Sequence, residues 1–143
     1  MDFWALRFCI LENLKAYKRF WCKSVMELVA LLSSGKGTWA QVSGLIKKGE
    51  WDKVILIGDS SAEELTTGSE TPHEFIRLDT EQKLVEMKET LMSKLKGKIG
   101  GIEVALSIAS GTGKEHMALI SALLSLPVGI RFSVLTQEGI VYL

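Results

Sequence analysis

The second half of the chain alternates short apolar runs with amphipathic segments, and this alternation limits the possible folds more than any other feature. The run Lys53–Gly58 (KVILIG) is rich in β-branched residues and contains no polar position between its ends. Such a run is typical of a strand that is buried on both faces. Comparable runs predict further strands at Glu74–Leu78, Ile102–Ile108, Ile130–Leu135 and Ile140–Leu143.

Two amphipathic helices are predicted between these strands. Asp79–Lys96 has apolar residues at spacings of three and four, Asp79 and Gln82 match a capping box, and Gly97 ends the segment. Lys114–Leu126 is a second, strongly apolar helix. The resulting order of strands and helices predicts an α/β layer fold with a mainly parallel sheet and a C-terminal β-hairpin.

The first fifty residues are interpreted as mainly helical. Apolar residues follow helical spacing over residues 10–32, and Ser24 with Glu27 matches a capping box. A further helix, Thr38–Lys48, follows a glycine-rich turn. Near the amino terminus a strand is an open alternative, because apolar residues also alternate at Trp4, Leu6, Phe8 and Ile10.

Length and composition exclude several classes of protein. The chain has 143 residues, which is a usual size for one domain, and we expect one domain over 1–143 with 51–143 as its clear α/β part. Seventeen basic and 17 acidic residues give no net charge, which argues against a duplex-DNA partner. No apolar run approaches the length that spans a bilayer, so we expect no membrane partner and a cytoplasmic location. Two cysteines and two histidines without zinc-site spacing lead us to expect no metal and no other cofactor.

Two predicted strand ends carry small and hydroxyl-bearing residues. Ligands of parallel α/β sheets bind at the carboxyl ends of the strands, where loops converge and helix amino termini offer amide donors. The first such end consists of Gly58, Asp59, Ser60 and Ser61. The second consists of Ser110, Gly111, Thr112, Gly113 and Lys114, with His116 one helical turn from it. We take these residues as the candidate ligand-binding residues.

The segment SGTGK invites comparison with known phosphate loops. A Walker A motif would need glycine at 108 and serine or threonine at 115, where the chain has Ile108 and Glu115. A GxGxxG motif would need a third glycine at the position of His116. A looser anion cradle remains, in which Thr112 and Glu115 form a capping box and Lys114 adds a positive charge. The alternative is a plain strand-to-helix turn with the same capping residues.

Each candidate side chain has a structural alternative. Lys114 either binds a phosphate or is a solvated lysine at a helix start. His116 either acts as a general acid or packs as an ordinary helix residue, and Asp59 either orients a ribose hydroxyl or caps its own turn.

The final third of the chain, SGTGKEHMALISALLSLPVGIRFSVLTQEGIVYL, resembles the CARF (CRISPR-associated Rossmann fold) domain. That family has a segment similar to (S/T)GGTK.M before an alanine- and leucine-rich helix, a strand and a terminal hairpin. A weaker similarity covers KVILIGDSSAEE. The resemblance implies a Rossmann-like three-layer fold, a homodimer, and binding of a cyclic oligoadenylate across the dimer axis in CRISPR antiviral defence.

The resemblance also implies roles for particular residues. Residues 110–114 would cradle phosphate and ribose, and Asp59, Ser60 and Ser61 would line the other edge of the site. Some members of the family, the ring nucleases, cleave the cyclic ligand without metal. For that step Lys114 and Ser110 are the candidate catalytic residues, with Lys114 stabilising charge as a ribose 2′-hydroxyl attacks the phosphodiester.

Three functions therefore stay open at the level of the sequence. The first is a CARF-like protein that senses a cyclic oligoadenylate or cleaves it. The second is a non-catalytic Rossmann-like interaction or scaffold protein. The third is a small enzyme that acts on another nucleotide. The apolar helix Lys114–Leu126 and the tryptophan-bearing amino-terminal region are the candidate dimer surfaces.

Overall fold

A computed structural model describes residues 26–33, 36–63 and 71–143. These residues form six strands and three helices. Their bounds are β1 Glu27–Leu32, α2 Lys36–Lys48, β2 Lys53–Gly58, β3 His73–Arg77, α3 Leu84–Leu95, β4 Glu103–Ser107, α4 Gly113–Leu124, β5 Gly129–Thr136 and β6 Gly139–Tyr142. Within these ranges, no helix combines the length and the apolar character that crossing a membrane requires.

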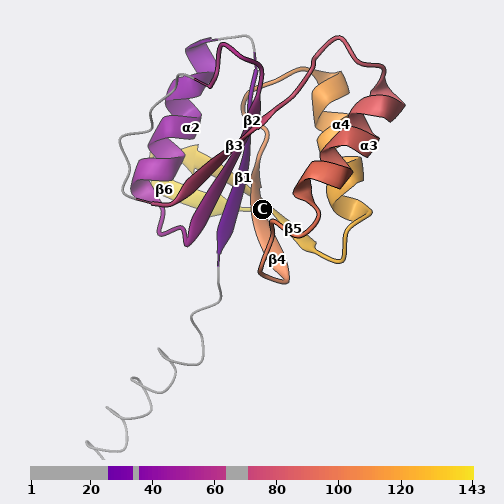
Figure 1. Cartoon of the computed structure of the whole chain (residues 1–143). Coiled ribbons are helices and arrows are strands. Elements are labelled where there is room, and N and C mark those ends of the chain that lie inside the picture. Colours follow the sequence, from indigo (N-terminus) through magenta and orange to yellow (C-terminus); the bar gives the residue numbers. More distant parts are fainter. Residues whose placement is uncertain (1–25, 34–35, 64–70) are drawn as a thin grey trace, which may run out of the picture.

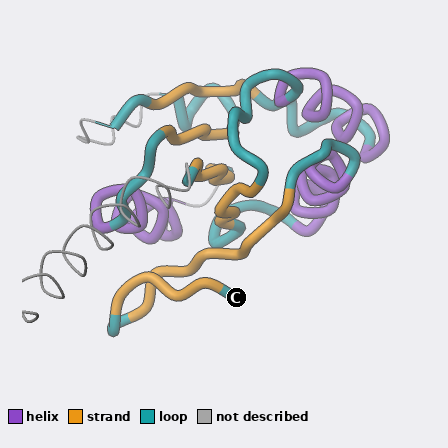
Figure 2. Tube along the Cα trace, turned by 90° about the horizontal axis from the view of Figure 1, so that it is seen from below, coloured by secondary structure: helices purple, strands orange, loops and turns teal. Residues whose placement is uncertain are grey.

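The strands form one sheet between two helical layers. The strand order is β3-β2-β1-β4-β5-β6, and all neighbours are parallel except the final β5–β6 hairpin. Helix α2 covers one face of the sheet, and α3 and α4 lie together on the other (Figures 1 and 2). The expected fold is thus confirmed: a Rossmann-like three-layer α/β fold with a mainly parallel sheet and a C-terminal hairpin.

Each face of the sheet has its own hydrophobic core. Alternate residues of β1 point to opposite faces. Leu28 and Leu32 pack with α2, whereas Val29 and Leu31 pack with α3 and α4. All four side chains are almost completely buried. The central strand is therefore shared by both cores, and a change in β1 affects both layers.

The position of β1 corrects the helical interpretation of the chain before residue 33. Glu27–Leu32 is a strand with every residue buried, and it pairs with both β2 and β4. Glu27 begins this strand, so it is not the third residue of a capped helix. A strand buried on both faces reads as a continuous apolar run, and such a run fits helical spacing as well as it fits a strand. The predictions for residues 1–25 lie outside the described residues.

Two helix starts also differ from the prediction. Helix α3 begins at Leu84 and not at Asp79, and no side chain caps it. The Asp79 carboxylate instead accepts a hydrogen bond from the Glu81 amide, two residues along, and so holds a turn before the helix. Helix α2 begins at Lys36, two residues before the predicted start. The predicted stop at Gly97 is confirmed, because this residue has φ +80° directly after the helix end.

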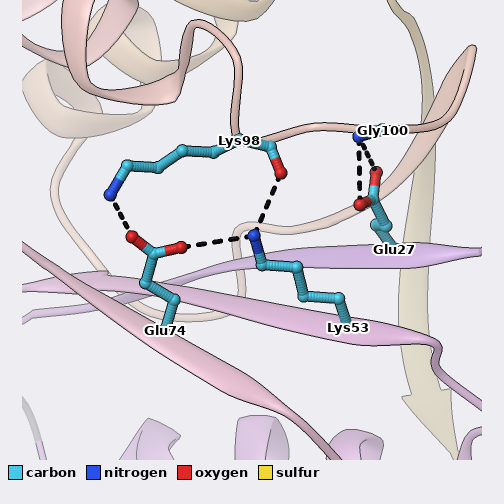
Figure 3. Close-up of polar contacts among 5 residues, drawn as sticks. All are labelled: Glu27, Lys53, Glu74, Lys98 and Gly100. Atoms are coloured by element: carbon cyan, nitrogen blue, oxygen red, sulfur yellow. Dashed lines mark hydrogen bonds and ion pairs between the residues drawn. The ribbon is translucent and has the colours of Figure 1, made fainter.

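Carboxylates at the amino-terminal ends of β1 and β3 hold the chain that joins α3 to β4. Glu27 is 4% exposed and accepts hydrogen bonds from the amides of Gly100 and Gly101 at 3.0–3.1 Å. Glu74 binds the ammonium groups of Lys53 and Lys98, and Lys53 also donates to the Lys98 carbonyl (Figure 3). These contacts lie at the opposite end of the strands from the predicted ligand loops.

Glu74→Gln is expected to remove a pH-dependent part of the stability. Hydrogen bonding to Lys98, and next to Lys53, holds the pKa of Glu74 below its ordinary value of 4.5. The contribution is therefore complete at neutral pH and is lost as the pH falls through and below 4.5. We expect a loss of about 0.5–1 kcal/mol at pH 7 that shrinks at low pH, measured by urea unfolding across pH. Glu89→Gln, whose partner Lys88 is on the same helix, is the matched control.

Candidate functional site

The strand order reverses direction between β1 and β4. From the carboxyl end of β1 the chain passes to α2 on one face, and from the carboxyl end of β4 it passes to α4 on the other face. Open α/β sheets bind their ligands outside the carboxyl ends of the strands, at such a reversal of strand order. We call the two loops there the switch-point loops: the loop after β1, which begins at Ser33, and the loop after β4, residues 108–112.

Buried hydrogen bonds join the two switch-point loops. The amide of Ser33 donates to Ser110 Oγ at 3.1 Å, and Ser33 Oγ donates to Glu115 Oε1 at 3.0 Å. Glu115 Oε2 accepts from the amide of Thr112 at 2.8 Å. Ser110 and Glu115 are each 2% exposed. One carboxylate thus links the end of β1 to the start of α4.

Gly111 occupies a backbone conformation that only glycine adopts easily. Its φ is +109°, and a Cβ there would lie 2.3 Å from Leu31 Cδ2, 3.0 Å from Glu115 Oε2 and 3.1 Å from His116 Nε2. His116 Nε2 in turn lies 2.9 Å from the Ser110 carbonyl oxygen, to which it can only donate. His116 therefore contacts the backbone of the loop and helps to hold the turn at Gly111 in place.

The amino terminus of α4 has the predicted capping box. The Thr112 side chain accepts from the Glu115 amide, and the Glu115 side chain accepts from the Thr112 amide. The amides of Gly113 and Lys114 belong to the first helical turn, where an α-helix offers no carbonyl partner. Both residues are exposed. An anion at this end of α4 would meet these amides and the positive end of the helix dipole.

Lys114 connects this loop to the segment between β3 and α3. Its ammonium donates to the carbonyl oxygens of Thr80 and Gln82, each at 2.8 Å. The side chain is thus neither directed at the loop after β1 nor free in solution. To reach a phosphate on the α4 amides, Lys114 would exchange these two carbonyls for phosphate oxygens.

The residues that follow β2 form a separate turn. Asp59 Oδ1 accepts from the Ser61 amide and hydroxyl and from the Ala62 amide. The hydrogen bond from the Ser61 hydroxyl is the main cause that lowers the pKa of Asp59 below its ordinary 3.8. Gly58 is required at the strand end, since a Cβ there would lie 2.3 Å from the Leu32 carbonyl oxygen. In the described part of the chain, no hydrogen bond joins Asp59, Ser60 or Ser61 to residues 110–116.

Sequence reasoning misses Ser33 as part of the site, and it assigns to Glu115 only the capping role in the anion cradle and not the contact with Ser33. The sequence predicts that Ser33 lies in a turn after a helix. Ser33 follows an apolar run that resembles Lys53–Gly58, and that repeated pattern is the signal that would have identified a second strand end. The described ranges hold no group of three or more histidine, cysteine, aspartate or glutamate side chains arranged for a metal ion.

Comparison with known proteins supports the fold and no particular family. No protein-family model and no curated protein matches the chain. Among solved structures, the chain is similar to protein VC1899 from Vibrio cholerae, with a TM-score of 0.60 and 12% sequence identity. The match covers 85% of this chain and 34% of that one, so the chain spans about a third of its structural neighbour. At this identity the similarity concerns the fold alone.

Proposed function

We propose that the chain binds a cyclic oligoadenylate at the switch-point loops, as a homodimer, in the manner of a CARF domain in the cytoplasm of a cell with CRISPR antiviral defence. One observation carries the proposal: the loops after β1 and β4 meet at the strand-order reversal, where Ser33, Ser110 and Glu115 join them beside the first turn of α4. The resemblance of the SGTGK segment supplies the identity of the ligand.

The chemistry of the switch-point loops suits a phosphodiester. The exposed residues at the start of α4 carry amides that can donate to non-bridging oxygens, and Gly111 gives the loop before them the positive φ that its turn requires. A neutral protein can bind such a ligand because a few amides and one lysine are sufficient. In a homodimer, two copies of the loop across a two-fold axis would match the symmetry of a cyclic ligand.

The test is a calorimetric titration with cyclic tetra-adenylate and cyclic hexa-adenylate. Lys114→Ala should weaken binding by about 1.5–3 kcal/mol if the ammonium contacts phosphate. Lys96→Ala, at the far end of α3, is the matched control and should bind as the unchanged protein does. The absence of binding by both rings would contradict the proposal.

Product analysis with chelator present separates a sensor from a ring nuclease. Linear products from the unchanged protein, and their loss in Lys114→Ala, would establish metal-independent cleavage. Stoichiometric binding with the ring intact would leave a sensor that acts through a partner. The scaffold alternative predicts that neither the unchanged protein nor Lys114→Ala binds a nucleotide, so the substitution makes no difference in the titration.

A further inference from the structure

A concave region at the edge of the sheet is lined neither by Ser33 nor by residues 108–112. It is a cleft of about 570 Å³ between the carboxyl ends of β2 and β3 and one side of α3. A volume of this size suits a small-molecule ligand. We call it the polar cleft, and its charged lining residues are Asp59, Arg77, Asp79 and Lys94.

Hydrogen bonds hold the walls of the polar cleft in place. Lys94, on α3, donates to the Arg77 carbonyl at the end of β3 at 2.7 Å. Lys114 donates to the carbonyls of Thr80 and Gln82, which belong to the loop between β3 and α3 and also line the cleft. The helix, the edge strand and the intervening loop are therefore tied together before any ligand arrives, which lowers the entropic cost of binding.

The polar cleft is lined by two acidic and two basic side chains, and some of their hydrogen-bonding atoms have no partner among the described residues. Asp59 accepts its hydrogen bonds through Oδ1, and Asp79 accepts one through Oδ1. Among the described residues, no donor reaches the second oxygen of either carboxylate, and no acceptor reaches the Arg77 guanidinium. The pKa of Asp59 lies below its ordinary 3.8, chiefly because of the hydrogen bond from the Ser61 hydroxyl, so this carboxyl carries its negative charge at neutral pH. The cleft thus presents both acceptors and cationic donors.

One wall of the polar cleft also contains an unsatisfied acceptor. Gln82 Nε2 donates to Thr90 Oγ1 at 3.4 Å, but no donor from the described residues reaches Gln82 Oε1, which is buried. A buried polar atom without a partner is uncommon and costs free energy. Because this oxygen is buried, a donor of a ligand in the polar cleft could reach it only if the Gln82 side chain moved.

We propose that the polar cleft binds a small sugar phosphate. Two cations, Arg77 and Lys94, match the double negative charge of a phosphate monoester, and Arg77 can bind it through two donors. The free oxygens of Asp59 and Asp79 match neighbouring sugar hydroxyls. A purely anionic or purely cationic ligand would be opposed by half of these charges. Free sugar phosphates and nucleoside monophosphates share this chemistry, and the proposal does not rest on the function proposed for the switch-point loops.

The test is a titration of the full chain with ribose 5-phosphate, adenosine monophosphate and inorganic phosphate, each followed by calorimetry. Ribose 5-phosphate should bind at least about tenfold more tightly than inorganic phosphate, because the hydroxyl contacts add to the ion pairs. Adenosine monophosphate binding more tightly still would identify a nucleotide as the ligand; equal affinity would identify a sugar phosphate. If none binds at millimolar concentration, the proposal is wrong.

Substitutions and NMR chemical shifts test whether the ligand binds in the polar cleft. Arg77→Gln should weaken binding at least about tenfold, whereas Arg131→Gln, an exposed arginine on β5 paired with Glu103, should not. Asp79→Asn keeps an oxygen for the Glu81 amide and should also weaken binding. In amide NMR spectra, ribose 5-phosphate should shift residues 77–82. Shifts confined to Ser33 and residues 110–113, or equal affinities of the two arginine variants, would overturn the proposal while leaving the switch-point function to its own test.

Discussion

Gly111→Ala should lower the free energy of unfolding by about 2–5 kcal/mol. The left-handed conformation at φ +109° costs an alanine about 1–2 kcal/mol, and displacing the buried Leu31 side chain adds overpacking strain of about 1–3 kcal/mol. The same contacts with Glu115 and His116 would shift the loop after β4, so binding at the switch-point loops should be lost as well. Urea unfolding and calorimetry measure the two effects.

Two other glycines separate the causes of that effect. Gly97→Ala has a positive φ of +80° but open space around the new Cβ, so it should show the backbone cost alone. Gly113→Ala has neither a positive φ nor any atom within 4 Å, and at the start of a helix alanine is favourable. If Gly111→Ala unfolds like Gly113→Ala, the described turn is not the conformation that the loop adopts.

Glu115→Ala should be the second large loss, about 2–4 kcal/mol. The substitution leaves the buried Ser33 hydroxyl and the partly buried Thr112 amide without their acceptor. An unsatisfied buried donor costs about 1–3 kcal/mol, and a partly buried one costs less. Glu115→Gln keeps one acceptor oxygen and should lose less. Glu86→Gln, an exposed glutamate in the first turn of α3, is the matched control for a lost charge near a helix start.

A double-mutant cycle assigns that loss to the connection between the two loops. Ser33→Ala and Glu115→Ala remove the same hydrogen bond. The double variant should therefore lose less free energy of unfolding than the sum of the losses in the two single variants, with a coupling of about 0.5–3 kcal/mol. Strictly additive effects would show that Glu115 acts only as a helix cap and that the switch-point loops are energetically independent.

Much of the architecture after residue 50 could be predicted from the sequence, because short β-branched runs and a threonine–glutamate capping box are local signals. The start of β1 could not be recognised in the same way. Leu28 to Leu32 satisfies a helical and an extended pattern equally, and only the pairing with β2 and β4 decides between them. Local chemistry likewise misplaced the start of α3, since Asp79 prefers a tight turn when the chain leaves an edge strand.

The candidate site likewise has a part that local sequence signals predict and a part that depends on long-range contacts. The loop after β4 is recognisable from its own residues, whereas the role of Ser33 depends on a contact with Ser110 across 77 positions of sequence. The polar cleft combines Asp59 with residues of β3 and α3, and no spacing rule in one sequence joins such segments. The ligand-binding roles of residues 58–61, 110–114 and 116, and the homodimer, remain predictions to be tested as described.

The two side-chain connections of β1 also set the order in which the chain can fold. At one end Glu27 binds Gly100, 73 positions away, and at the other Ser33 binds Ser110, 77 positions away. During synthesis β1 can pair with β2 early, but its other edge stays unpaired until β4 has been made. Long-range pairing of this kind slows folding and leaves a strand edge open to other chains in the meantime. The centre of the sheet, which is its most buried part in the finished protein, is thus the part that is completed late.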